Sequence, residues 1–297
     1  MTEPARPPSS AQRLVFLGTP EAAVAPLRAL VAAGFEIALV VSRPDRRRGR
    51  GGALSPSPVK AAAIELGLPV TDELDDVLAT GADLGVVVAY GRIIPTRILE
   101  LVPMVNLHFS LLPRWRGAAP VERALLAGDT ETGVCVMDVD VELDTGAVHA
   151  VARTPIGADD TTASLLARLS TMGAGLLVDI LRAGLDRPTP QEGEITYAAK
   201  IDPAELHIDW SVPASAIDRL VRVGGAFTTF RDARLKIHAV SPVEHGSAPA
   251  GTLDGRVVAC GTGAVELLEV QPEGRARQSA RDGVNGTRPT PGERLGA

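Results

Sequence analysis

The sequence predicts an α/β domain with a mostly parallel sheet, followed by a smaller domain of short β-strands. Three observations support this prediction. Up to residue 183, short apolar runs typical of buried parallel strands alternate with Ala- and Leu-rich helical segments. After Gly184 the composition changes to a mixture of Pro, Gly, Gln and Glu that is typical of a linker. From Leu206 onward, a single helical segment precedes short β-like runs.

The elements of the first domain follow from its apolar runs and the residues that end them. Residues 1–12 are rich in Pro and Ser and are expected to be disordered. The first strand, 14–17, runs into a Gly-Thr-Pro turn, where Thr19 is a candidate N-cap and Pro20 is tolerated in the first helical turn. Further strands are expected at 37–41, 84–90, 105–108, 132–139 and 147–156. Helices are expected at 21–33, 59–66, 119–126 and 161–183.

The boundaries of the domains follow from the change in composition. We expect the first domain to span 13–184, a linker to span 185–205 and the second domain to span 206–297. The second domain has a net charge of +1 and the rest of the chain −7, so the small domain is the less acidic one. A helix is expected in it at 214–223. Its strands are expected at 235–240, 256–260 and 265–270.

The overall composition is that of an ordinary globular protein, with 45% hydrophobic and 22% charged residues among 297. A net charge of −6 argues against a generally basic nucleic-acid-binding surface, although it allows a local basic patch. Both cysteines, Cys135 and Cys260, stand in apolar stretches, so neither a disulfide nor a metal site is expected. The apolar runs, such as 84–90, are too short to span a bilayer, and the N-terminus has no signal-peptide pattern. A cytoplasmic protein without membrane contact is the simplest expectation.

The turn after the first strand is the place where a dinucleotide-binding fingerprint would stand. Such a fingerprint needs three glycines in G-x-G-x-x-G spacing, and this turn has only Gly18. Glu21 would also bring a negative charge close to the pyrophosphate. The turn is therefore interpreted as an ordinary strand-to-helix connection rather than an NAD site.

A strongly basic loop follows the second expected strand. It carries five arginines, at positions 43, 46, 47, 48 and 50, against one acidic residue, Asp45. A flexible cationic loop of this kind can bind a polyanion through Arg–phosphate contacts and the release of counterions. The alternative interpretation is an ordinary solvated surface loop.

The segment 105–117 contains the most informative side chains. Asn106 and His108 are two residues apart, so on a strand they project from the same face. They stand at the carboxyl end of an expected parallel strand, where open α/β sheets bind ligands. An Asn amide can donate hydrogen bonds, and a His ring can also exchange a proton near neutral pH. The alternative is a histidine that only packs or caps within the core.

Asp144 stands in a Leu-Asp-Thr-Gly segment between two expected strands. Locally this is an ordinary turn, because Asp accepts hydrogen bonds from nearby amides and Gly allows a positive φ. Its spacing in the sequence does not show that Asp144 approaches His108.

Together these segments closely resemble the 10-formyltetrahydrofolate-dependent formyltransferases. The resemblance covers nearly the whole chain after the first dozen residues. The combination of Asn106, His108, Ser-Leu-Leu-Pro and Leu-Asp-Thr-Gly is specific to formyl transfer from the folate. The basic loop, ITYAAKI and the C-terminal domain indicate the branch that acts on tRNA. The matching segments are FLGTPE (16–21), SRPDRRRGRGGALSPSPVK (42–60), VVVAYGRIIP (86–95), NLHFSLLPRWRGAAP (106–120), LDTG (143–146), ITYAAKI (195–201), HIDWS (207–211) and the tail QPEGR…NGTRP (271–289).

The resemblance implies a Rossmann-like catalytic domain and a small barrel of the oligonucleotide-binding (OB) kind. It implies a metal-free, monomeric enzyme that formylates the α-amino group of methionyl initiator tRNA, for translation initiation, with 10-formyltetrahydrofolate as donor. The catalytic residues would be Asn106, His108 and Asp144. The folate site would include Ser110, Leu111, Leu112 and Pro113, with Tyr90 and Gly91 shaping the pterin pocket. Arg46 and Arg50 match basic positions of the family's tRNA-binding loop.

The chemistry of these side chains leads to a hypothesis of how they would act. Asn106 and the His108 ring would donate hydrogen bonds to the formyl oxygen as negative charge develops on it. Asp144, with His108 or a bound water, would move the proton from the attacking amine to N10 of the folate.

Several positions depart from the family pattern. Phe109 occupies a position that is often Gly, and Arg47 and Arg48 make the loop more basic than usual. The stretch 222–227 is shorter than usual and has Phe for Trp, and the tail has Gln278 and Gly283 at positions that are usually apolar or aromatic. Two alternatives stay open: a folate-dependent formyltransferase acting on a sugar or nucleotide amine, and a non-catalytic RNA-binding protein built on the same scaffold.

Overall fold

The computed structural model describes residues 4–48, 52–185, 187–244, 246, 248–290 and 292–296. The chain forms two compact units. The first unit comprises Met1–Val121, Glu131–Pro155 and Ser164–Ala199. The second comprises Glu122–Thr130, Ile156–Ala163 and Lys200–Ala297.

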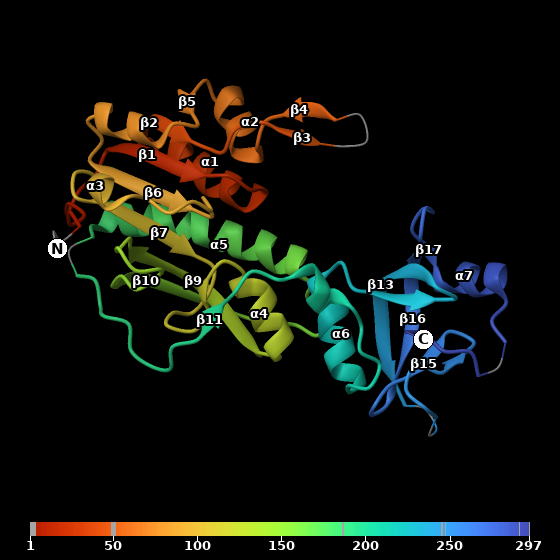
Figure 1. Cartoon of the computed structure of the whole chain (residues 1–297). Coiled ribbons are helices and arrows are strands. Elements are labelled where there is room, and N and C mark those ends of the chain that lie inside the picture. The colour runs from red at the N-terminus through yellow and green to blue at the C-terminus, as the bar shows by residue number, and fades with distance from the viewer. Residues whose placement is uncertain are drawn as a thin grey trace. The chain divides into compact units, whose positions relative to one another are not determined.

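The first unit is built on a seven-stranded, mostly parallel sheet with the order β10-β9-β7-β6-β1-β2-β5 (Figure 1). Strands β5, β2, β1, β6 and β7 run parallel, and β9 is antiparallel to both of its neighbours. The sheet confirms the α/β class predicted from the sequence. Its strands are β1 (Arg13–Gly18), β2 (Glu36–Val41), β5 (Val70–Thr71), β6 (Leu84–Val88), β7 (Met104–His108), β9 (Glu131–Asp138) and β10 (Val148–Pro155).

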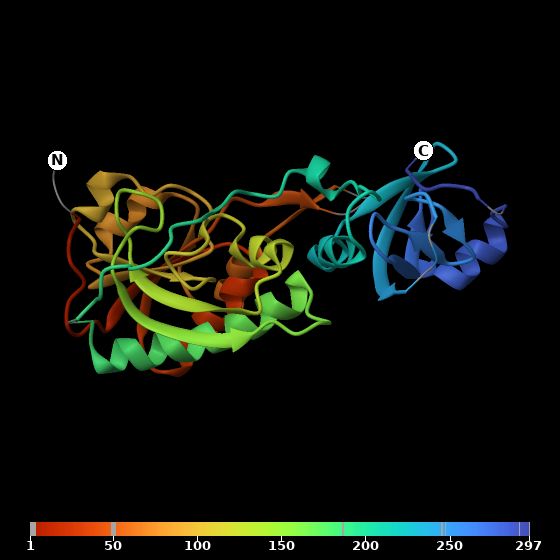
Figure 2. The same ribbon diagram turned by 90° about the horizontal axis from the view of Figure 1, so that it is seen from below.

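Helix α5 (Thr162–Ala183) lies along the sheet, beside the long ribbons of β9 and β10 (Figure 2). A Cβ on Gly173 would lie 2.7 Å from the side chain of Leu107, so the helix packs closely against β7 at this point. Leu107 points to the opposite face of the strand from Asn106 and His108, which leaves those two side chains clear of α5. The other helices of this part of the chain are α1 (Val24–Ala32), α2 (Pro58–Glu65), α3 (Thr96–Leu99) and α4 (Pro120–Ala127), with 3₁₀ helices at Glu21–Ala23 and Leu74–Ala79.

Helix α5 is also the only described helix that is long and apolar enough to cross a membrane by length and composition alone. The apolar runs read from the sequence were all expected to be too short for this. The helix buries Leu165, Leu169, Leu177 and Leu181, as expected for a core helix of an α/β domain.

Two local predictions in the N-terminal part need correction. Thr19 does not cap a helix, because its Oγ1 donates to the carbonyl of Tyr90 at 3.2 Å and the chain enters a 3₁₀ turn after Pro20 instead. Within the tail expected to be disordered, the described residues contact the first unit: the N–H of Ala5 donates to the carbonyl of Leu99 at 2.8 Å, and Ala11 is buried.

The segment expected to be a linker is bound to the first unit over much of its length. Thr189 exchanges two backbone hydrogen bonds of 2.8 Å with Val148. Further on, β11 (Tyr197–Ala198) pairs in parallel with β8 (Arg116–Gly117). The composition of this segment did not predict either pairing, since both depend on partners far away in the sequence.

The second unit contains an antiparallel sheet with the order β12-β13-β16-β15-β14, and β17 pairs with β16. Its helix α6 (Ala214–Val223) has the bounds predicted from the sequence. The predicted strands 235–240 and 265–270 lie within β13 and β16, and β15 lies within the predicted strand 256–260, whereas the other short strands and the last helix were not predicted. The strands are β12 (Phe227–Phe230), β13 (Ala233–Val243), β14 (Leu253–Asp254), β15 (Val257–Ala259), β16 (Ala264–Pro272) and β17 (Gln278–Ser279), and the other helices are α7 (Ala280–Thr287) and a 3₁₀ helix at Pro203–Leu206.

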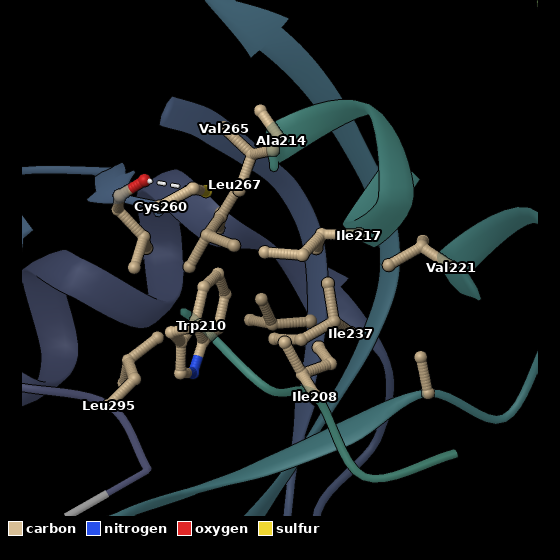
Figure 3. Close-up of a cluster of buried hydrophobic side chains, with 14 of the residues drawn as sticks. Ile208, Trp210, Ala214, Ile217, Val221, Ile237, Cys260, Val265, Leu267 and Leu295 are labelled. Carbon is tan, nitrogen blue, oxygen red and sulfur yellow. Dashed lines mark hydrogen bonds between the residues drawn. The ribbon is translucent and has the colours of Figure 1, made fainter. Parts of the chain in front are cut away.

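The core of the second unit gathers around Trp210 (Figure 3). Its indole is buried and its Nε1 donates to Thr228 Oγ1 at 3.0 Å, so the one polar atom of the ring is satisfied inside the core. Helix α6 contributes Ile217, and strand β13, which lies between β12 and β16, contributes Ile237, which is fully buried. This cluster gives the small unit a hydrophobic core of its own.

We expect Ile237→Ala to lower the free energy of unfolding of this unit by about 2–5 kcal/mol, because it leaves a cavity in a packed core. Leu268→Ala is the matched control, since Leu268 lies on the neighbouring strand β16 but is 41% exposed. This substitution should change the free energy of unfolding by less than about 0.5 kcal/mol. Urea denaturation of the full chain, followed by the fluorescence of Trp210 in a Trp115→Phe background, measures both. Equal effects of the two substitutions would contradict this account of the core.

Candidate active site

The structure brings together the three side chains expected to be catalytic. Asn106 and His108 lie at the carboxyl end of β7, and Asp144 lies in the turn between β9 and β10. Asn106 Nδ2 is 3.4 Å from Asp144 Oδ1, and His108 Nδ1 is 3.6 Å from Asp144 Oδ2. The side chains of His108 and Asp144 are only 6% and 10% exposed. An amide, an imidazole and a carboxylate therefore meet at this edge of the sheet.

The orientation of the His108 ring follows from its neighbours. Nε2 lies 2.9 Å from the carbonyl oxygen of Trp115, and a carbonyl only accepts, so Nε2 is the donor. The other nitrogen faces Asp144. Both ring nitrogens thus face protein oxygens, and donation from the ring to a formyl oxygen would require it to turn away from Trp115. Asn106 differs, because its amide has two N–H groups and only one is directed at Asp144.

Two glycines fix the position of the Asp144 carboxylate. The N–H of Gly117 donates to Asp144 Oδ2 at 2.8 Å. Gly117 has a φ of +126°, and a Cβ there would lie 2.7 Å from the carbonyl oxygen of Ala198, so only glycine fits. A Cβ on Gly146 would overlap the carbonyl of Asp138. Asp144 itself has a φ of +53°, which is unusual outside glycine and places its side chain toward β7.

Gly117 was given no role in the sequence analysis, although it is the last residue of the informative segment 105–117. A glycine next to a polar motif is a signal for a close backbone approach, and it could have been used. Its partner in that approach, Ala198, is 81 residues away in the sequence and could not have been identified from the local pattern.

The segment expected to bind folate folds back on itself beside His108. The buried hydroxyl of Ser110 donates to the carbonyl of Arg114 at 2.6 Å, so it stabilises the turn rather than pointing outward. Leu111 and Leu112 are half-buried and Pro113, which follows a cis peptide bond, is buried.

The thiol of Cys135 lies under this turn and donates to the carbonyl of Ser110 at 3.1 Å. Burial raises the pKa of this thiol to about 11, so it stays protonated at neutral pH and packs as a small apolar group.

Tyr90 and Gly91 lie at the neighbouring strand end, since β6 pairs with β7 through Val87 and Asn106. Tyr90 packs into the apolar cluster on this side of the sheet, and its burial raises the pKa of its phenol above the usual value. Gly91 has a φ of +70°, and its carbonyl accepts from Arg43. Strand β1 is flanked by β2 and β6, so this is also the point where the strand order reverses, the usual ligand site in open α/β sheets.

The basic loop contains a small hairpin formed by β3 (Arg46–Arg48) and β4 (Ala53–Ser55), which projects from the first unit (Figure 1). Asp45 is paired with Lys60 at 2.7 Å, so the single acidic residue of the loop does not neutralise its arginines. Arg46 is exposed and forms no ion pair with any described residue. Arg50, the second expected tRNA contact, lies outside the described residues.

In the part of the chain that the structure describes, no group of three or more His, Cys, Asp or Glu residues is arranged to hold a metal ion. The metal-free reaction implied by the resemblance therefore stays a prediction.

Comparison with known proteins assigns the family. Residues 12–181 match the model of the formyl transferase family, and residues 200–288 match that of the formyl transferase C-terminal domain. The chain belongs to the formyl transferase family. A relative named methionyl-tRNA formyltransferase, from Roseobacter denitrificans, is 50% identical over 93% of this chain and 96% of that protein. One of the same name from Symbiobacterium thermophilum is 45% identical over 92% of both chains.

Solved structures share the fold at low identity. An N-formyltransferase from Helicobacter canadensis, in complex with folinic acid and dTDP-3-aminofucose, has a TM-score of 0.64 at 15% identity, covering 86% of this chain and 99% of that one. HypX from Aquifex aeolicus, in complex with tetrahydrofolic acid, also has a TM-score of 0.64, at 16% identity, covering 93% of this chain and 47% of that one.

We expect Gly117→Ala to lower the free energy of unfolding of the first unit by about 1–3 kcal/mol, because it forces a side chain into a strained φ and against Ala198. Gly175→Ala is the matched control: Gly175 is in α5 with open space around it, so the same change should stabilise the helix by up to about 1 kcal/mol. Thermal and urea denaturation of the full chain would show the two effects, and a neutral Gly117→Ala would contradict the close approach.

Proposed function

We propose that this chain transfers the formyl group of 10-formyltetrahydrofolate to the α-amino group of methionyl initiator tRNA, for translation initiation. The observation that carries the proposal is the meeting of Asn106, His108 and Asp144 at the ligand-binding edge of a formyl transferase sheet. The acceptor is supported by relatives named methionyl-tRNA formyltransferase, which are up to 50% identical along nearly the whole chain.

In the proposed reaction the lone pair of the α-amino nitrogen attacks the formyl carbon. A free α-amino group has a pKa of about 7.7–8.0, so part of it is already neutral near pH 7 and no strong base is needed. The attack places negative charge on the formyl oxygen. The free N–H of the Asn106 amide is the donor available to stabilise that charge, because its other N–H is directed at Asp144.

The attacking nitrogen then carries a positive charge and must lose a proton, while N10 of the folate must gain one before its bond to the formyl carbon breaks. The Asp144 carboxylate beside the His108 ring is the base in this site, and it can accept the first proton and return it to N10. The buried position of the pair keeps this exchange away from bulk water. Tetrahydrofolate leaves, and the amine keeps the formyl group.

The folate is proposed to lie along the carboxyl ends of β6 and β7. Ser110, Leu111, Leu112 and Pro113 would border it on one side and Tyr90 with Gly91 on the other. Two structures of the same fold contain folates, namely folinic acid in the Helicobacter enzyme and tetrahydrofolic acid in HypX. The 10-formyl donor and a reaction without a metal are part of this proposal.

The tRNA is proposed to contact the β3–β4 hairpin, through Arg46 and Arg50, and the second unit. The antiparallel sheet of that unit, together with the net charge of +1 over residues 206–297, suits an OB-type nucleic-acid-binding role better than the acidic remainder of the chain. We further propose a monomeric, cytoplasmic enzyme, as this reaction on tRNA requires neither a membrane nor a second subunit.

The acceptor is tested by supplying 10-formyltetrahydrofolate with either methionyl-tRNA or a dTDP-linked amino sugar and measuring the formylated product. Formylation of methionyl-tRNA with little transfer to the sugar supports the proposal. The reverse preference would replace it with a sugar N-formyltransferase, and no transfer to either, together with no folate binding, would indicate a non-catalytic RNA-binding protein.

We expect Asn106→Ala to lower kcat by about 10²–10³-fold, because it removes the donor to the developing oxyanion. The Kd for folate should change little, since the interaction forms in the transition state. Asn285→Ala is the matched control, because Asn285 is the only other asparagine and is exposed on α7. Near-normal turnover of Asn106→Ala would remove Asn106 from the mechanism.

We expect Arg46→Ala to raise the KM for methionyl-tRNA and to make the slope of log affinity against log salt shallower by about 0.7–0.9, the loss of one phosphate contact. Neutralising Arg50 as well should add a similar change. Arg97→Ala is the control, since Arg97 is exposed but paired with Asp75 at 2.6 Å. An unchanged salt slope for Arg46→Ala would exclude the hairpin from tRNA binding.

A further inference from the structure

Gln191 makes four hydrogen bonds around the turn that carries Asp144, although it belongs to the segment expected to be a linker. Its amide nitrogen donates to the carbonyl of Asp144 at 2.9 Å and to that of Gly146 at 2.8 Å. Its amide oxygen accepts from Arg116 Nε at 3.0 Å and from Arg116 Nη2 at 2.7 Å. All the hydrogen-bonding capacity of one side chain is therefore directed at the site.

Together with the hydrogen bond from Gly117 to the Asp144 carboxylate, these contacts form one continuous hydrogen-bond network. Arg116 directly precedes Gly117, whose N–H donates to Asp144 Oδ2 at 2.8 Å. Gln191 thus joins the backbone of the Asp144 turn to the strand that holds the Asp144 side chain. Arg116 is itself only 8% exposed, and the amide oxygen of Gln191 accepts two hydrogen bonds from its guanidinium.

We infer that Gln191 is a positioning residue for the formyl transfer, acting through Asp144; the inference rests on the function proposed above. Asp144 has a φ of +53°, a conformation that persists only where its surroundings fix it. The two carbonyls need N–H donors and the guanidinium needs an acceptor, so a carboxamide meets both needs in one residue. Without it, the turn is free to relax and the carboxylate moves away from His108 and Asn106.

The substitution Gln191→Glu tests whether Gln191 positions the Asp144 turn or only fills space. The substitution keeps the length of the side chain and an oxygen for Arg116, so the protein should fold, with an ion pair in place of a neutral contact. It replaces the N–H donors with an oxygen that faces two carbonyl oxygens, which repels the turn. If Gln191 only fills space or neutralises the surroundings of Arg116, Gln191→Glu should be as active as the unmodified chain.

The experiment compares the unmodified chain with Gln191→Glu, Gln191→Ala and the control Gln12→Ala, in formylation of methionyl-tRNA at saturating substrates. Gln12 is exposed and precedes β1 at the amino end of the sheet, and its hydrogen bond to Asp83 uses the backbone N–H, which the substitution keeps. We expect both Gln191 variants to lose about 10- to 100-fold in kcat, as small misplacements of catalytic groups do. KM for both substrates should stay within about twofold, and Gln12→Ala should keep the unmodified kcat.

Two further measurements make the outcome decisive. Adding Gln191→Glu to Asp144→Asn should cause no further loss of kcat, because the two residues act as one unit. Amide hydrogen exchange in the peptides spanning 114–118 and 140–147 should become faster in Gln191→Glu without substrate present. Turnover within about twofold of normal, or unchanged exchange, overturns the inference.

The same data distinguish failure of the inference from failure of the proposed function. If the unmodified chain does not formylate methionyl-tRNA, the proposed function is wrong, and the exchange measurement still decides whether Gln191 holds the turn. If the unmodified chain formylates methionyl-tRNA and the Gln191 variants are as active as the unmodified chain, the proposed function stands and the inference about Gln191 is wrong.

Discussion

The contact between the Asp144 carboxylate and the N–H of Gly117 is the interaction on which the rest of the site depends. It joins the turn between β9 and β10 to β8, the short strand at the end of the segment 105–117. A carboxylate that accepts a backbone N–H is held in a defined position without the need for a cation. Asn106 and His108 can then approach it from the rigid end of β7. Precise placement of these groups comes from hydrogen bonds to main-chain atoms rather than from ion pairs.

The features that the sequence predicted well are those with a strong local cause. Alternation along a strand places Asn106 and His108 on one face, and the apolar run before them identifies the strand itself. The bounds of α6 were predicted because Pro213 precedes it and Gly224, with a φ of +97°, ends it. The three residues expected to be catalytic, in contrast, were assigned by resemblance, and the geometry places Asp144 within 3.6 Å of both Asn106 and His108.

The features that the sequence did not predict depend on distant partners. The strand β11 consists of Tyr197 and Ala198, and two residues carry no periodicity that could reveal their pairing with β8. The hairpin strand β3 consists of three arginines, and a composition of this kind predicts a loop rather than a strand. Thr19 is a residue type that often caps helices, but its hydroxyl donates to the carbonyl of Tyr90 instead. Each of these outcomes depends on tertiary contacts, which the local propensities of the residues do not predict.

The orientation of the His108 ring limits which proposed role each of the three side chains can have. Since Nε2 donates to Trp115 and Nδ1 faces Asp144, the ring is held between a main-chain oxygen and the carboxylate. A ring held this way can orient Asp144 and share a proton with it, whereas it has no third position for the formyl oxygen. In the proposed reaction the donor to that oxygen is then the Asn106 amide, which does not titrate and therefore supplies the same hydrogen bond at any pH where the protein is folded. The proposed mechanism thereby assigns charge stabilisation and proton transfer to different residues, so neither depends on the protonation state that the other needs.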